Sequence, residues 1–107
     1  MKSSLATLHG VVAELSDPSA ELRLLAAKLQ EELRNQETRL AVDYFDNNIV
    51  ISYHRTIVLY WRVADGELAC FPTGWRQRTY RTTGAVRARE ITIHLLFEFV
   101  REFWNGA

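Results

Sequence analysis

Apolar residues recur every three or four positions at both ends of the chain and at every second position in its middle. The first spacing is typical of a helix with one buried face, and the second of a half-buried strand. Two helices are therefore predicted before the alternating part. Their stripes are Leu5, Leu8, Val12 and Leu15 in the first helix and Leu22, Leu25, Leu29 and Leu33 in the second. Asp17 and Pro18 suit the start of the second helix, as a capping carboxylate and a first-turn proline.

The alternating middle part predicts an antiparallel meander. After a first strand over about 40–44, Asp46-Asn47-Asn48 predicts a turn, since asparagine tolerates a positive φ. The odd positions from 49 to 63 are apolar with hardly a break, so we expect one long strand there, bent or bulged near His54-Arg55. Asp65-Gly66 is a strong hairpin signal. Pro72-Thr73-Gly74 then predicts a turn towards a fourth, more polar strand over about 75–82.

The predicted turns also predict a register. A two-residue loop at Asn47-Asn48 would pair Tyr44 with Ile51, and the Asp65-Gly66 loop would pair Trp61 with Cys70. Both pairings place apolar residues on one face of the sheet, and a one-residue slip would destroy this agreement. The face would carry Ile51, Tyr53, Leu59, Trp61 and Cys70. A face this apolar must be covered by helices.

A last helix is predicted over about 83–104. Its apolar face consists of Ala88, Thr92, Leu95, Leu96, Phe99, Val100 and Phe103. A short strand over 90–95 is the alternative, because that stretch also alternates. The predicted fold is α+β, with two N-terminal helices, an antiparallel meander of about four strands, and a C-terminal helix packed on the sheet. No linker or repeat divides the chain, so residues 1–107 are expected to form a single domain.

Composition narrows the class of protein without naming a function. The 107 residues are 48% hydrophobic and 24% charged, as in an ordinary globular domain. No apolar run approaches the roughly 20 residues that cross a bilayer, and the first ten residues lack a signal-peptide pattern. We therefore expect a cytoplasmic protein with no membrane partner. The single cysteine, Cys70, faces the predicted core, and His9, His54 and His94 fall on different elements, so neither a metal nor a cofactor is expected.

Charge is balanced overall but segregated along the chain. Residues 75–89 contain five arginines and no acid, so this segment is +5 and the rest of the chain is −5. Guanidinium groups bind carboxylates and phosphates bidentately, and aromatic residues beside them are typical of interfaces. The predicted partner-binding surface consists of Trp75, Arg76, Arg78, Tyr80, Arg81, Arg87 and Arg89. In the alternative interpretation, the arginines protect an edge strand or pair with Glu31, Glu32, Glu37 or Asp65.

Two more groups of residues are predicted on the sheet face opposite the core. Val58, Tyr60, Arg62 and Phe71 form a predicted secondary interface for a partner or a second subunit, unless an N-terminal helix covers them. In the predicted register Asp43 lies across from Ser52 and near His54, which are the residue types of an acyl-transfer triad. A solvated polar face explains these three residues better, since no nearby element supplies an oxyanion hole.

The sequence thus favours a non-catalytic interaction protein that presents arginine and aromatic side chains to an acidic protein surface. An adaptor, a chaperone-like subunit and an inhibitor, such as those that phages encode, all fit this description, and a homodimer is open. The alternative is a nucleic-acid-binding domain that uses the same arginines. If all five contacted duplex DNA phosphates, the slope of log affinity on log salt would be about −4.5. A small Ser/His hydrolase is the least favoured hypothesis.

Overall fold

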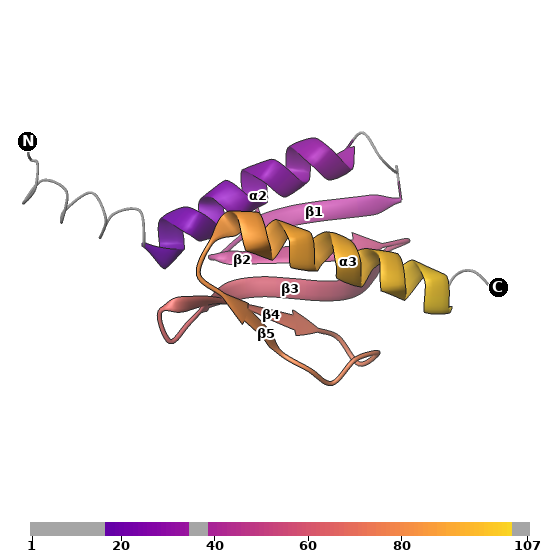
Figure 1. Cartoon of the computed structure of the whole chain (residues 1–107). Coiled ribbons are helices and arrows are strands. Elements are labelled where there is room, and N and C mark those ends of the chain that lie inside the picture. Colours follow the sequence, from indigo (N-terminus) through magenta and orange to yellow (C-terminus); the bar gives the residue numbers. More distant parts are fainter. Residues whose placement is uncertain (1–16, 35–38, 104–107) are drawn as a thin grey trace, which may run out of the picture.

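The computed structural model describes residues 17–34 and 39–103, which form an α+β fold (Figure 1). The elements follow in the order α2 (Pro18–Arg34), β1 (Leu40–Phe45), β2 (Asn48–Tyr53), β3 (Thr56–Ala64), β4 (Glu67–Pro72), β5 (Tyr80–Thr82) and α3 (Ala85–Phe103). The predicted fold class is confirmed, but the antiparallel sheet has five strands rather than four. The helix predicted over residues 5–15 lies outside the described residues.

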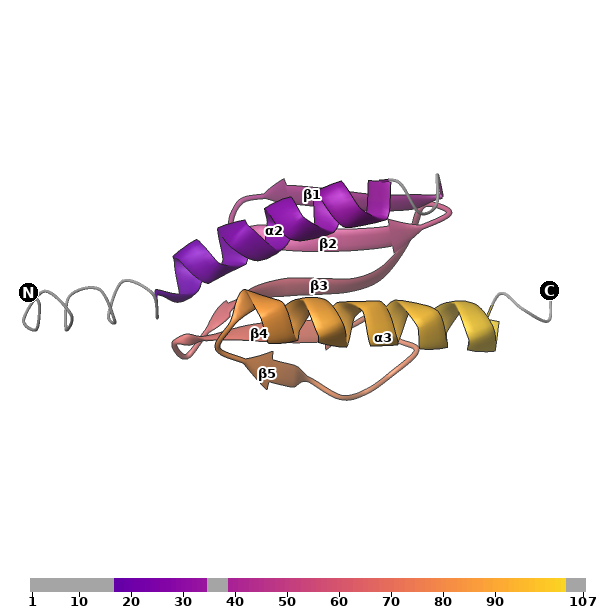
Figure 2. The ribbon, with the colours of Figure 1, turned by 45° about the horizontal axis from the view of Figure 1, so that its top comes forward.

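The five strands lie side by side in sequence order, and both described helices cover the same face of the sheet (Figure 2). The residues predicted to face the helices do so: Ile51, Leu59, Trp61 and Cys70 are fully buried, and Tyr53 nearly so. They pack in one core with the leucine stripe of α2 and most of the predicted apolar face of α3, but Phe103 at the end of that face is 47% exposed. The predicted placement of the core is therefore confirmed.

The prediction of one long strand over residues 49–63 is wrong, because the chain reverses at His54-Arg55. These two residues have φ values of 53° and 68°, and Tyr53 pairs with Thr56 across them. After a two-residue turn, the even-numbered residues of the next strand point to the face that the odd-numbered residues of the preceding strand occupied. A β-bulge at Val58 exchanges the two faces again, because Ile51 pairs with Leu59 but Ser52 pairs with Ile57. The two exchanges cancel, which is why the sequence pattern continues unbroken through a hairpin.

The first hairpin turns one residue earlier than predicted. Its loop residues are Asp46 and Asn47, with φ values of 54° and 59°. Tyr44 consequently pairs with Ile49 instead of Ile51, a register shift of two residues. A shift of two leaves every side chain on its predicted face, so the core is unaffected. The predicted Asp65-Gly66 turn is confirmed, with Trp61 opposite Cys70.

The remaining differences concern the segment before the last helix. The fourth predicted strand corresponds to β5, which is only three residues long, because residues 73–79 form a loop. The bulge holds this loop: the backbone N–H of Thr73 and the indole N–H of Trp75 each donate to the Val58 carbonyl, at 2.9 Å. The alternative strand over 90–95 is wrong, since the whole stretch is helical in α3.

Two side-chain hydrogen bonds position α3 over the sheet. The indole N–H of Trp61 donates to the Thr92 hydroxyl at 2.7 Å, and that hydroxyl donates to the Ala88 carbonyl at 2.8 Å. Both groups are fully buried, so each satisfies the other. At the helix start, the backbone N–H of Ala85 donates to a Glu21 carboxylate oxygen of α2 at 2.8 Å. The two helices are thereby fixed against each other and against β3.

Candidate functional site

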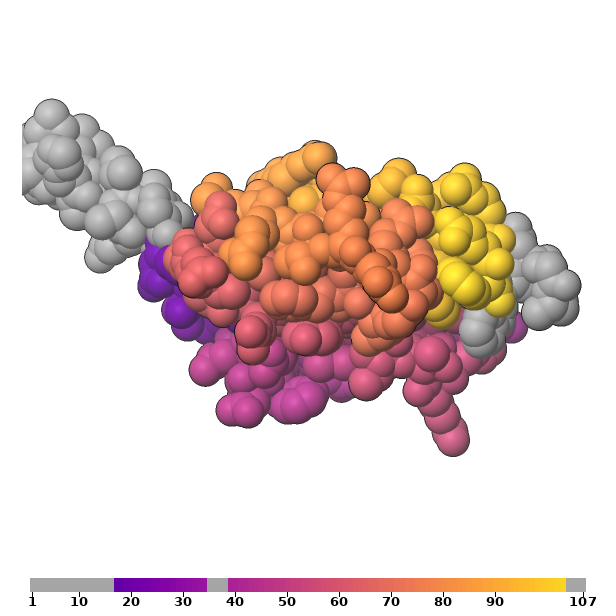
Figure 3. Space-filling view, turned by 90° about the horizontal axis from the view of Figure 1, so that it is seen from below, coloured from indigo at the N-terminus to yellow at the C-terminus, as the bar shows by residue number. Residues whose placement is uncertain are grey.

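The seven residues of the predicted partner-binding surface do not form one surface. Four of them, Arg78, Tyr80, Arg81 and Arg87, line a groove between β5 and α3. Trp75 and Arg76 lie against the C-terminal half of α3, and Arg89 faces α2. Figure 3 looks onto this edge of the molecule, where the orange segment that includes β5 lies beside the yellow end of α3.

Trp75 and Arg76 anchor the 73–79 loop to α3. The Trp75 ring lies edge-on to Phe99 and Phe103, with centroid distances of 5.3 and 6.0 Å. The Arg76 guanidinium lies over Trp75, and its Nη1 is 2.6 Å from Oε1 of Glu98. A hydrogen bond to the Tyr80 hydroxyl, followed by the contacts with Glu98, raises the pKa of Arg76. These contacts give both side chains a structural role.

Arg89 joins the two helices through a bidentate ion pair. Its Nε and Nη2 each lie 2.6 Å from an oxygen of the Glu32 carboxylate on α2. The hydrogen bonds from Arg89 hold the pKa of Glu32 below its ordinary value of 4.5, and the same contact raises the pKa of Arg89. Glu32 was among the acids named as structural partners from the sequence, and here that interpretation is confirmed.

The groove between β5 and α3, which we call the β5–α3 groove, has a volume of about 530 Å³. Its lining residues are Arg78, Thr79, Tyr80, Arg81, Arg87, Glu90, Ile91, His94 and Leu95. The guanidinium groups of Arg78 and Arg87 and the carboxylate of Glu90 thus surround an apolar floor, which gives the groove a positive charge, whereas the guanidinium of Arg81 lies on the opposite face of the sheet. Sequence analysis missed the contributions of Glu90, Ile91, His94 and Leu95, because they come from one helical face whose neighbour is fixed only by tertiary packing.

The three arginines of the groove differ in their partners. The Arg78 guanidinium lies 5.1 Å from the centre of the Tyr80 ring and forms no ion pair with a described residue. Arg87 pairs with Glu90 of its own helix at 2.9 Å, although its side chain is 68% exposed. Arg81 lies 3.6 Å from Asp65 and 3.7 Å from Glu67 and donates to the Ala64 carbonyl. Arg78 and Arg87 are therefore the arginines most available to a ligand.

The predicted secondary interface lies on the sheet face that no described helix covers, which we call the open face. Its strand residues are Ala41, Asp43, Phe45, Asn48, Val50, Ser52, Ile57, Tyr60, Arg62, Ala64, Glu67, Ala69, Phe71 and Arg81. The rings of Tyr60 and Phe71 stack with a centroid distance of 5.1 Å, and the Arg62 guanidinium lies 5.3 Å from Phe71. Val58 does not belong to this face: the bulge turns it inward, and it is fully buried.

The acyl-transfer arrangement considered from the sequence does not form in the predicted way. Asp43 lies opposite Val50, and Ser52 lies opposite Ala41, because the register differs by two residues from the predicted one. His54 is a loop residue of the hairpin. Burial raises the pKa of the Cys70 thiol to about 12, so Cys70 is not a thiolate nucleophile. Among the described residues there is no group of three or more His, Cys, Asp or Glu side chains that could hold a metal.

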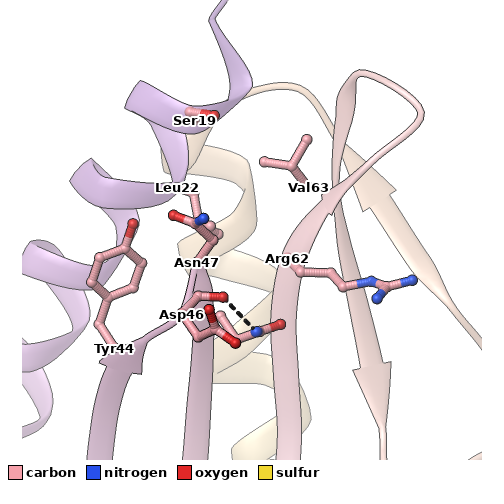
Figure 4. Close-up of a pocket in the computed structure, with 8 residues that line it drawn as sticks. Ser19, Leu22, Tyr44, Asp46, Asn47, Arg62 and Val63 are labelled. Atoms are coloured by element: carbon pink, nitrogen blue, oxygen red, sulfur yellow. Dashed lines mark hydrogen bonds between the residues drawn. The ribbon is translucent and has the colours of Figure 1, made fainter.

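A smaller hollow of about 320 Å³ lies at the start of α2 (Figure 4). Leu22, Tyr44 and Val63 line it beside the Asp46-Asn47 turn, and the picture shows Arg62 pointing away from it. Its lining residues include neither histidine nor cysteine, so it offers no serine–histidine or thiol chemistry. The Asn48 amide already donates to the Asp46 carbonyl at 2.8 Å.

Comparisons of the chain with protein-family models, with curated proteins and with solved structures find no match. Neither described helix is long and apolar enough to cross a membrane. The functional argument therefore depends on the surfaces of the molecule alone.

Proposed function

We propose that this protein is a non-catalytic interaction module that binds an acidic segment of a partner protein in the β5–α3 groove. The observation that carries the proposal is the lining of the groove, in which the guanidinium groups of Arg78 and Arg87 and the ring of His94 surround Tyr80, Ile91 and Leu95. Arginine beside aromatic side chains is a combination enriched at protein interfaces. An extended segment that alternates acidic and apolar residues matches this lining.

The exposed ion pair in the groove favours a binding role over a purely structural one. A surface pair such as Arg87 with Glu90 contributes little to stability, so an incoming carboxylate can replace Glu90 at small cost. Arg78 has only the Tyr80 ring as a partner among the described residues. A bidentate carboxylate would give each guanidinium a stronger interaction than it has in the free protein.

The same ion pairs disfavour the nucleic-acid alternative. Four of the five arginines in residues 75–89 contact carboxylates: Arg76, Arg81, Arg87 and Arg89. A phosphate approaching these arginines meets their acidic partners as well, which weakens the attraction. A single acidic peptide segment requires only Arg78 and Arg87, whereas a nucleic-acid backbone requires an extended positive surface.

The test is the binding of a labelled peptide of about ten residues that alternates glutamate with leucine or phenylalanine, measured by fluorescence anisotropy. We expect the Arg78→Ala/Arg87→Ala variant to weaken binding about tenfold or more, because two charge-assisted contacts are lost. The matched control is Arg23→Ala/Arg34→Ala, which removes two exposed arginines from α2. Equal binding by both variants would contradict the proposal. A labelled DNA duplex that binds more tightly than the peptide would favour the nucleic-acid alternative instead.

A further inference from the structure

The open face combines a half-exposed aromatic pair with charged side chains that lack ionic partners. Asp43 on β1 and Arg62 on β3 are both exposed, and neither forms an ion pair with a described residue. They cannot easily meet within one copy, because β2 separates their strands and places them about 9.6 Å apart across the sheet. At the end of β1, Phe45 is 58% exposed. A partner that offers the opposite arrangement of charge would complement these features.

Strand pairing arranges the open face in rows across the sheet. One row runs Phe45, Asn48, Arg62, Ala69 and Arg81, from β1 to β5. The next row runs Asp43, Val50, Tyr60 and Phe71, from β1 to β4. The carboxylate of the second row is therefore at β1. The Arg62 guanidinium leans over Phe71, towards the β4 end of that same row.

We infer that two copies of this chain associate through their open faces about a two-fold axis that runs parallel to the strands between β2 and β3. Such an axis places β1 of one copy over β4 of the other, and β2 over β3, and it keeps each row over its counterpart. Asp43 then lies over Phe71 of the second copy, where the guanidinium of that copy's Arg62 is found. The symmetry forms this ion pair twice, as an isologous interface requires.

The apolar contacts agree with the same arrangement. Val50 lies over Tyr60 of the second copy, which extends the Tyr60–Phe71 stack into a continuous apolar strip across the interface. Phe45 lies over the β4 position of Ala69 of the second copy, whose own side chain is fully buried, and beside that copy's Arg62 and Arg81 in the same row. Phe45 therefore packs on the aliphatic parts of these arginine side chains rather than on Ala69 itself.

The size of the face indicates a weak dimer. Four strands spaced about 4.8 Å apart and five residues at about 3.3 Å each give roughly 300 Å² of sheet plane per copy, before side-chain relief is added. Stable complexes bury about 800 Å² of accessible surface on each partner. We therefore expect a weak dimer whose fraction depends strongly on protein concentration.

Sedimentation equilibrium of the full chain at low salt, from about 10 µM to about 1 mM, tests this inference. Asp43→Arg and Arg62→Asp each place like charges face to face, and each should weaken the dimer about tenfold or more. The combined variant Asp43→Arg/Arg62→Asp restores both pairs and should return within about threefold of the wild type. Arg23→Asp/Glu31→Arg on α2 is the matched control. Far-ultraviolet circular dichroism and thermal unfolding verify that each variant is folded.

Three results would overturn the inference: a wild type that stays monomeric throughout the concentration range, a dimer that none of the open-face variants weakens, or a double variant as weak as the single ones. If Arg62→Asp does not fold, Phe45→Ser replaces it. This variant should also weaken the dimer, and it should fold because Phe45 is already largely exposed.

A separate measurement uses labelled oligothymidine at protein concentrations where the chain is monomeric. Its binding to the wild type and loss in Tyr60→Ala would assign the face to single-stranded nucleic acid instead. Arg78→Ala/Arg87→Ala should leave the dimer unchanged, which separates this test from that of the groove.

Discussion

The two faces of the same sheet differ in how they treat side chains that are neighbours along the chain. Trp61 points towards the helices and is fully buried, with its indole N–H bonded to Thr92. Tyr60, the preceding residue, points the other way and is half-buried against Phe71. On the covered face, the polar group of Trp61 is hydrogen-bonded inside the molecule. On the open face, aromatic and charged side chains remain accessible to a partner. Stability should therefore depend on the first face and association on the second.

Substitution of Trp61 should give the largest effect and tests this comparison most directly. We expect Trp61→Ala to lower the free energy of unfolding by about 3–5 kcal/mol, because a large cavity forms in the core and the Thr92 hydroxyl loses its partner. Tyr60→Ala should lower it by only about 1 kcal/mol or less, the range of a cross-strand pair. Urea denaturation, measured at concentrations below dimerisation, gives both values. Equal losses at the two positions would contradict the assignment of stability to one face.

The second prediction concerns the buried hydrogen bond between the side chains of Trp61 on β3 and Thr92 on α3. Thr92→Val keeps the shape of the side chain but removes the acceptor of the Trp61 indole N–H. A buried donor left without a partner costs about 1–3 kcal/mol, and we expect a loss of that size in thermal or urea unfolding. Thr79→Val, at an exposed position of the β5–α3 groove, is the control and should change stability by less than about 0.5 kcal/mol.

The covered face could be predicted from sequence because its signals are local and repeated. The leucine stripe of α2, the alternation in the strands and the Asp65-Gly66 turn each indicate the same inward residues, and the structure confirms them. A register error of two residues in the first hairpin did no harm, because the face of each side chain has a period of two.

The open face was harder to predict because a turn and a β-bulge have opposite effects on the alternation of apolar and polar residues in the sequence. The His54-Arg55 turn contains neither glycine nor asparagine, although both residues have positive φ. The bulge at Val58 then restores the parity that the turn had exchanged. Val58 was consequently placed on the wrong face. Asp43 was placed opposite the wrong residue for a different reason, because the first hairpin turns one residue earlier than predicted.

The charged residues show the same limit of sequence analysis. Five arginines close together in the sequence suggested one basic surface, but β5 is short and the loop before it wraps around the sheet edge onto α3. The guanidinium groups therefore end in different places: on the end of α3, in the groove, at the Asp65-Gly66 turn and at the seam between α2 and α3. The pairing of each arginine with an acidic residue depends on the tertiary structure, and the number of charges along the sequence does not predict it.

The smallest expected change in stability comes from removing one carboxylate on either side of the sheet. The Arg89 contact holds the pKa of Glu32 below 4.5, so the ionised pair stabilises the fold above that pH, and the contribution is lost as pH falls through the lowered value. Glu32→Gln should thus be less stable than the wild type near neutral pH, and the two should converge in acid. The difference is small because both side chains are about one-third exposed and salt screens them.

Asp43→Asn on the open face is the matched change on the other side of the sheet, because Asp43 forms no ion pair with a described residue. Near neutral pH and below the concentration at which dimers form, its thermal unfolding midpoint should equal that of the wild type. At high concentration it should fall below that of the wild type, since only the dimer offers Asp43 an arginine. A departure in the dilute sample would mean that the open face already uses its charge within one copy, and that the two faces do not divide stability and association between them.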